Sequence, residues 1–190
     1  MRHFLGNVIS VVYSFLRFFV IKLFHWNSFH YYPIERVSPN VIVTVGRKSS
    51  MELGNKVRIH SFSRIISVAG GKLRIGDNCR FNHHCAIVCR DRVEIAPGVE
   101  FGPNVLIYDH DHDFRVPGGL KAGKFKTGPV RIGENSWIGA NTVILRNTTI
   151  GANCIIGAGC IVKGNVPDNT ILVQKRENNF IERVNMGDES

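Results

Sequence analysis

The chain has 190 residues, 44% of them apolar, and a formal net charge of +9 at pH 7. This length and apolar content favour one globular domain with short appendages and argue against a disordered or fibrous chain. The charge indicates an anionic partner, such as phosphates or a lipid surface, but no nucleic-acid-binding motif is present, and we exclude nucleic acid as a partner.

Residues 1–30 predict an N-terminal amphipathic helix. Nearly all side chains from Phe4 to Phe24 are apolar, apart from one narrow stripe at helical spacing. That stripe consists of Asn7, Ser10, Ser14 and Arg17. The longest uncharged stretch, residues 3–16, is short for a spanning helix, which needs about 20 residues. Three interpretations stay open: peripheral membrane contact through residues 3–25, packing against the same domain or a neighbouring subunit, and a spanning anchor.

Residues 31–40 contain two prolines and predict a connector, so we expect the repeats that follow to begin near Val41. Beyond residue 172, the polar segment 173–190 predicts a C-terminal tail.

The C-terminal half repeats every sixth residue. The apolar positions are Ile132, Ile138, Ile144, Ile150, Ile156 and Val162, and a small residue stands two positions before each of the last five. Neither a helix nor a flat strand has this period. A parallel β-helix does, because each short strand stacks about 4.8 Å from an equivalent strand in the next coil. The sequence therefore predicts an all-β fold, a parallel β-helix over residues 31–172.

The same spacing runs upstream and is then interrupted. The upstream positions are Ile75, Phe81, Ile87, Val93, Val99 and Val105, with a fainter trace back through Ala69, Ser63, Val57, Met51 and Val45. The interval from Val105 to Ile132 is not a multiple of six, so we expect an inserted loop at residues 108–127. A loop that interrupts a regular scaffold is a common place for function.

The five cysteines form no CxxC pair, and four of them stand at small inward positions of the repeat. We interpret them as small apolar residues of the core, and we expect a reducing, cytoplasmic compartment.

The inserted loop also carries the residues best suited to catalysis. His110 and His112 alternate with Asp109, Asp111 and Asp113. A neutral imidazole is the natural general base near pH 7, and a carboxylate on its other nitrogen can hold the required tautomer. Solvated side chains and a divalent-cation site are the alternative interpretations of this run.

Several segments together resemble the hexapeptide-repeat acyltransferases. They are the two hexad runs, PNVLIYDHDHDF, FKTGPVRIG where the repeats resume, and WIGANTVIL. The likeness is greatest to O-acetyltransferases of bacterial surface-polysaccharide biosynthesis, which are relatives of the maltose and galactoside acetyltransferases. It implies a left-handed β-helix that forms a homotrimer, with acetyl-CoA as co-substrate between subunits and no metal. The implied reaction transfers an acetyl group to a hydroxyl of a saccharide acceptor. The helix at Phe4–Phe24 would suit a lipid-linked acceptor at the inner face of the cytoplasmic membrane.

The resemblance also assigns residues. The histidine eight positions after Asn104 is the implied base, which selects His112 and leaves His110 as the competitor or as a positioning group. Residues implied to approach the acceptor are Asn82, His84 and Asp109. Residues implied to contact CoA are Trp137, Ala140, Ala158, Gly159, Lys163, Lys175 and Arg176. The segments at residues 163–164 and 173–178 depart from the family pattern, which puts the grip on the nucleotide end of CoA in doubt.

Two other function classes remain open. One is a metal hydratase like the γ-type carbonic anhydrases, with imidazoles from His83, His84, His110 and His112. The other is a non-catalytic, sugar-binding trimer.

Overall fold

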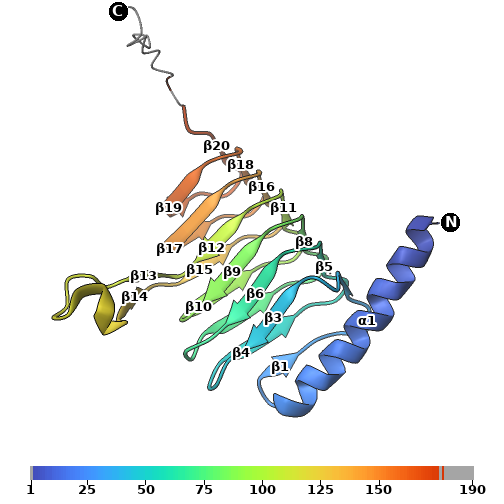
Figure 1. The fold of residues 1–190 in the computed structure, drawn as a ribbon. Helices are drawn as coiled ribbons and strands as arrows, with labels where there is room; N and C mark the ends of the chain where they lie inside the picture. The colour runs from blue at the N-terminus through green and yellow to red at the C-terminus, as the bar shows by residue number, and fades with distance from the viewer. Residues whose placement is uncertain (1, 176, 178–190) are drawn as a thin grey trace, which may run out of the picture.

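The computed structural model describes residues 2–175 and residue 177. One helix, α1 (Arg2–Phe24), precedes a stack of short strands that forms a three-sided prism (Figure 1). The expected C-terminal tail, including Arg176, lies outside the described residues except for its first few positions.

Each coil of the prism contributes one strand to each of three faces. Face 1 holds β1 (Phe29–His30), β4 (Ser50–Leu53), β7 (Lys72–Ile75), β10 (Arg92–Ile95), β15 (Val130–Ile132) and the C-terminal parts of β17 (Val143–Ile150) and β19 (Ile161–Val166). Face 2 holds β3 (Ile42–Val45), β6 (Arg64–Ser67), β9 (Ala86–Cys89), β12 (Leu106–Tyr108) and the N-terminal parts of β17 and β19. Face 3 holds β2 (Arg36–Val37), β5 (Arg58–Ile59), β8 (Arg80–Phe81), β11 (Glu100–Phe101), β16 (Trp137–Ile138), β18 (Ile155–Ile156) and β20 (Ile171–Leu172). All pairings along the faces are parallel, which confirms the predicted parallel β-helix.

The interior is a set of columns in which like side chains stack from coil to coil. Phe81 lies 4.4 Å from Phe101 between ring centroids, and Ile138 and Ile156 continue this column. The five cysteines are buried and free, as expected of small core residues. Such stacking buries apolar surface along the whole prism, which is the main stabilising contribution to a solenoid.

The upstream six-residue register is wrong in detail. Arg58 pairs with Arg80, and Arg80 pairs with Glu100, so these coils are longer than three hexads; a later coil, from Trp137 to Ile155, equals three hexads. The spacing of six survives because each strand buries alternate residues. When a coil is longer by an even number of residues, every sixth residue can therefore still be an inward one. Ala69 is an exception, because it lies in an exposed turn.

The prism begins earlier than predicted. Strand β1 pairs with β4 and β2 pairs with β5, so the first coil starts at Phe29 and residues 31–40 belong to it. Strands of two residues are too short to leave an alternating pattern, which explains why the sequence alone indicates a connector here.

Helix α1 packs on this first coil through its polar stripe. Ser14 is 1% exposed, and its Oγ accepts the backbone N–H of Val37 at 3.0 Å. Arg17 donates from Nη1 to the carbonyl oxygen of Val41 at 2.6 Å, and Phe18 is fully buried. Packing of the helix on its own domain is thus confirmed. Within the described part of the chain, no helix is long and apolar enough to cross a bilayer.

The insertion forms a hairpin where it was expected. Strand β13 (His110–His112) pairs antiparallel with β14 (Phe125–Thr127), and a 3-10 helix, η1 (Gly119–Ala122), lies between them. The hairpin projects from the prism beside β15 (Figure 1).

Candidate active site

The hairpin leaves the prism at the edge between faces 2 and 1, called here the insertion edge. It is formed by residues 89–91, 109 and 145–147 of successive coils. Asp109 is 0% exposed, and its carboxylate accepts the backbone N–H groups of Arg90 at 2.9 and 3.0 Å and of Asp91 at 2.7 Å. These bonds hold a charged carboxylate in place and stabilise it inside the edge.

Asp109 also orients His110. Its Oδ1 lies 2.9 Å from Nδ1 of His110, whose side chain is 11% exposed. A carboxylate on Nδ1 selects the tautomer that carries its proton there and leaves Nε2 as the basic nitrogen. Asp109 thus holds the ring of His110 in this structure, and its predicted approach to an acceptor stays a prediction.

His112 has a different environment. It is exposed, and no hydrogen bond to its ring is present in the part of the chain described here. Its ring lies 4.5 Å from that of Phe125, measured between centroids. The two candidates in the hairpin therefore differ: one imidazole is held by a buried carboxylate, and the other is held by an aromatic contact alone.

Three residues that the sequence alone did not single out complete this edge: Phe125, Arg90 and Arg146. Phe125 lies 5.4 Å from the ring of His110 in an edge-on arrangement, and the guanidinium of Arg90 lies 3.7 Å from the centroid of Phe125. Arg146, from β17, donates from Nε to Asp111 at 2.6 Å and ties the hairpin to the prism. The interruption of the repeat at Asp91 was the available signal, because it marks this edge as irregular.

The predicted CoA and acceptor residues gather at the edge between faces 3 and 2, called here the small-residue edge. Successive coils place Asn82 and His84, then Ala140, then Ala158 and Gly159, in one column along this edge. Ala158 is exposed, and Trp137, at the end of face 3, is 55% exposed. Lys175 follows β20 and is exposed; Lys163 is exposed too, but it lies near the insertion edge.

Below these small residues the edge becomes aromatic. His60 lies 4.9 Å from His83 between ring centroids, and Phe62 stacks on His84 at 5.2 Å with an interplanar angle of 14°. The small, uncharged upper part leaves room for a ligand against the main chain, and the lower part offers flat rings.

One chain does not bring the two edges together. They border opposite sides of face 2, whose strands, such as Ala86–Cys89, are four residues long. At about 3.3 Å per residue, the edges are separated by roughly 13 Å. The structure thus unites His110 with His112 and Asp109, and Asn82 with His84, Ala140, Ala158 and Gly159, as two separate groups.

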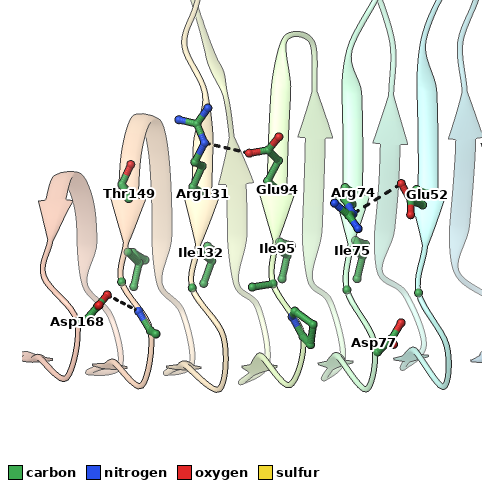
Figure 2. Close-up of a pocket in the computed structure, with 18 of the residues that line it drawn as sticks. Glu52, Arg74, Ile75, Asp77, Glu94, Ile95, Arg131, Ile132, Thr149 and Asp168 are labelled. Carbon is green, nitrogen blue, oxygen red and sulfur yellow. Dashed lines mark hydrogen bonds and ion pairs between the residues drawn. The ribbon is translucent and has the colours of Figure 1, made fainter.

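The edge between faces 1 and 3 carries a groove of about 740 Å³ (Figure 2). Its two arginines are each paired with a glutamate: Arg74 lies 3.6 Å from Glu52, and Arg131 lies 2.9 Å from Glu94. The groove contains none of the predicted site residues and has no surplus of positive charge for a phosphate.

Buried cysteine thiols lie both beside the insertion edge, at Cys89, and at the edge between faces 1 and 3, at Cys79. Burial, together with the negative charge of Asp109, raises the pKa of Cys89 to about 12, and burial raises the pKa of Cys79 to about 11. Both thiols therefore stay protonated at neutral pH and are poor nucleophiles.

The histidines show no arrangement typical of a metal site. His83 and His84 lie at the small-residue edge, whereas His110 and His112 lie at the insertion edge. Among the residues described, no three His, Cys, Asp or Glu side chains come close enough to hold a metal ion.

Residues 129–164 match the family described as bacterial transferase hexapeptide (six repeats). Nodulation protein L of Rhizobium leguminosarum bv. viciae is 41% identical over 71 residues, which cover 36% of this chain and 36% of that protein. The match thus spans about a third of the curated relative.

Solved structures share the fold over most of the chain. AntD, an N-acyltransferase from Bacillus cereus in complex with dTDP and coenzyme A, superposes with a TM-score of 0.65 at 23% identity, covering 80% of this chain and 81% of AntD. The acetyltransferase domain of PglB from Neisseria gonorrhoeae, in complex with acetyl coenzyme A, gives a TM-score of 0.53 at 19% identity over 72% of this chain and 53% of that one. The family match and these folds confirm the resemblance to hexapeptide-repeat transferases with a left-handed β-helix.

Proposed function

We propose that this chain, which carries the bacterial transferase hexapeptide repeat over residues 129–164, is an O-acetyltransferase that moves an acetyl group from acetyl-CoA to a sugar hydroxyl. The observation that carries the proposal is the pair formed by Asp109 and His110, at the point where the inserted hairpin leaves the prism. A buried carboxylate that orients an imidazole is the arrangement of a general base.

We assign the base to His110, although counting from Asn104 favours His112. The carboxylate of Asp109 is fixed by three backbone hydrogen bonds, so its 2.9 Å contact with Nδ1 holds the ring of His110 in one orientation. His112 has no such partner and serves as a neighbouring group of the site.

In the proposed reaction, Nε2 of His110 takes the proton from the acceptor hydroxyl as its oxygen attacks the thioester carbonyl. The new C–O bond forms a tetrahedral intermediate, whose oxyanion is stabilised by hydrogen-bond donors, an effect worth about 3–4 kcal/mol. The C–S bond then breaks, and the imidazolium returns the proton to the thiolate of CoA. No acyl-cysteine intermediate is required, in keeping with the raised pKa values of Cys79 and Cys89.

We place CoA along the small-residue edge. Ala140, Ala158 and Gly159 leave the main chain open to a ligand there, and Trp137 offers an exposed ring. Solved proteins of this fold were obtained with coenzyme A or acetyl coenzyme A, which supports a CoA thioester as donor. Lys163, Lys175 and Arg176, which lies outside the described residues, are proposed phosphate contacts.

The separation of the two edges supports a shared site. Because roughly 13 Å lies between them in one chain, the imidazole of one copy meets the thioester held at the small-residue edge of the next. A head-to-tail contact of this kind closes into a ring, and we propose a homotrimer with three such sites.

The acceptor is proposed to be a saccharide of surface-polysaccharide biosynthesis, lipid-linked at the cytoplasmic face of the membrane. Peripheral contact through residues 3–25 would bring the enzyme to such an acceptor. The net charge of +9 favours an anionic surface of this kind.

The test compares His110→Asn with His112→Asn in an assay of CoA release from acetyl-CoA with a panel of sugars and sugar nucleotides. We expect His110→Asn to lower kcat by about 10²–10⁴-fold, the usual contribution of a general base, and His112→Asn to lower it less than about tenfold. The reverse order would refute the assignment of His110. CoA release that no acceptor accelerates, in a correctly folded wild-type protein, would refute acyl transfer.

A further inference from the structure

Helix α1 directs polar side chains toward the protein and apolar side chains outward, which is the reverse of an ordinary surface helix. The side chains of Ser14, Arg17 and Lys22 point into the protein. Lys22 donates from Nζ to the carbonyl oxygens of Trp26 at 2.6 Å and Phe29 at 2.7 Å. A surface helix normally presents such groups to water and its apolar stripe to the core.

The outward side of α1 is consequently apolar over residues 8–24. Ten large apolar side chains of the helix are between 41% and 81% exposed: Val8, Ile9, Val12, Tyr13, Phe15, Leu16, Phe19, Val20, Leu23 and Phe24. No acidic residue occurs in the helix, and Trp26, just after it, is 66% exposed. Contiguous apolar surface of this extent indicates an interaction site.

A cationic hollow of about 590 Å³ lies at the C-terminal end of this apolar side. Phe24 and His25 form one wall, and the turn after β3 supplies Arg47 and Lys48, with Lys72 from β7 beside them. The lining contains no carboxylate. None of these three Lys and Arg side chains forms an ion pair within the part of the chain described, unlike the paired cations of the groove in Figure 2.

We infer that the outward side of α1 and this hollow form one bilayer-docking surface, in which the helix enters the acyl-chain boundary and Arg47, Lys48 and Lys72 bind the phosphates of anionic phospholipids. The inference deepens the membrane contact proposed above by giving it a headgroup site. Docking rests on α1 and the first coils, so it does not depend on the acyl-transfer chemistry.

The contacts of α1 define how it would lie. The helix is bonded to the first coil both at Ser14 and at Lys22, so only its outer side is available to lipid along its length. An apolar side flanked by lysine and arginine is typical of a helix that lies in the plane of the interface. A symmetric contact with a second copy is less suited to this surface, because neither α1 nor the hollow carries a carboxylate that could pair with the cations of the other copy.

The first experiment is flotation of the full-length protein with vesicles of phosphatidylcholine alone or with roughly a third phosphatidylglycerol. We expect tighter binding to the anionic vesicles, weakened by salt. In the hollow variant, Arg47→Gln, Lys48→Asn and Lys72→Gln are combined. At about fivefold per cation, it should lose about two orders of magnitude of that affinity. Retention of wild-type affinity by the hollow variant would overturn the headgroup site.

A matched pair controls for charge and backbone. Lys48 and Lys56 are both exposed and both have φ of 60°, but Lys56 lies at the edge between faces 1 and 3. Asparagine tolerates this conformation, so Lys48→Asn and Lys56→Asn change charge equally with little strain. Only Lys48→Asn should weaken binding to anionic vesicles. Equal effects of the two variants would show that binding depends on the total charge of the protein and not on the hollow.

The helix is tested in two ways. Leu16 and Phe19 both lie on the outward side, and their combined replacement by glutamate should abolish binding to either kind of vesicle. If the double variant still binds vesicles but has a smaller oligomer mass than wild type, the occupant of this surface is a second copy. In the wild-type fold with Trp137→Phe, Trp26 is the one remaining tryptophan, since the chain has two. Lipids brominated on the acyl chains should quench its fluorescence. Absence of quenching with bound vesicles would overturn insertion of α1, whatever the outcome for His110.

Discussion

Replacing Asp109 with asparagine tests the proposed base through the residue that holds it. In Asp109→Asn, one oxygen becomes an NH₂ group facing donors, either the N–H groups of Arg90 and Asp91 or Nδ1 of His110. Each lost bond is charge-assisted and is worth about 1.5–3 kcal/mol. If about 3 kcal/mol of this is transition-state stabilisation, kcat falls by roughly 150-fold.

The acetylation assay should show this loss in kcat with the KM of acetyl-CoA unchanged, because the buried Asp109 contacts no substrate. Asp113→Asn is the control. That carboxylate lies in the same hairpin, 3.3 Å from Nζ of Lys126, and a partly exposed pair of this kind contributes about 0–1 kcal/mol. We therefore expect it to change kcat less than about threefold. A folded Asp109→Asn protein with wild-type kcat would refute the assignment of His110, as would equal losses in the two variants.

Three further predictions concern stability and the donor. Burial raises the pKa of Glu35, inside the first coil, from 4.5 to about 8. Between these two pH values the folded state retains a proton that the unfolded state loses. The contribution of Glu35 to the free energy of unfolding is therefore complete below pH 4.5 and is lost as pH rises to about 8, by up to about 1.4 kcal/mol per pH unit. Denaturant titrations should show this slope in wild type and a flat profile in Glu35→Gln; a slope retained in the variant would contradict the assignment. In Gly133→Ala the new Cβ would collide with the backbone of Gly151 and Ala152, whereas in Gly157→Ala it would meet a side-chain methyl of Val173 at 3.1 Å. The first change should lower the free energy of unfolding by about 2–3 kcal/mol and the second by under about 1, and equal Tm values would show that the coils are not packed as described. Ala158→Glu places a carboxylate at the small-residue edge, so the KM of acetyl-CoA should rise at least about tenfold through repulsion of its phosphates, whereas Ala152→Glu at another edge should leave it unchanged.

The stacking of coils was predictable because it depends on a local rule. Every strand buries alternate residues, so the spacing of Ile132, Ile138 and Ile144 is enough to predict which side chains point into the core. The position of the insertion at residues 108–127 follows from the same count. What the count missed is coil length, since an even extension of a turn leaves the inward pattern intact.

The orientation of α1 was not predictable from its pattern. Ser14 and Arg17 mark one stripe, but the sequence does not say whether that stripe faces water or the protein. The free main-chain groups of the first coil decide it: Val37 and Val41 offer backbone groups that the side chains of the stripe satisfy. The first coil was not predictable from the sequence, because β1 and β2 have two residues each and are too short to show an alternating pattern.

The choice between His110 and His112 likewise required three dimensions. Counting from Asn104 treats the run of alternating His and Asp as equivalent positions. In the structure the main chain of Arg90 and Asp91 buries Asp109 and leaves Asp111 exposed, so only one histidine acquires an oriented carboxylate partner. Sequence spacing carries no information on such a contact from the coil below.

Mixing two impaired variants tests the shared site. His110→Ala lacks the base and should be inactive, and Ala158→Glu, with its raised KM, should retain at most about a tenth of wild-type activity at low acetyl-CoA. In trimers reassembled from equal amounts of both, an intact base faces an intact edge at about a quarter of the sites, given head-to-tail contacts in a ring. The account predicts recovery of about a quarter of wild-type activity, and mixed trimers of verified composition with no recovered activity would contradict it.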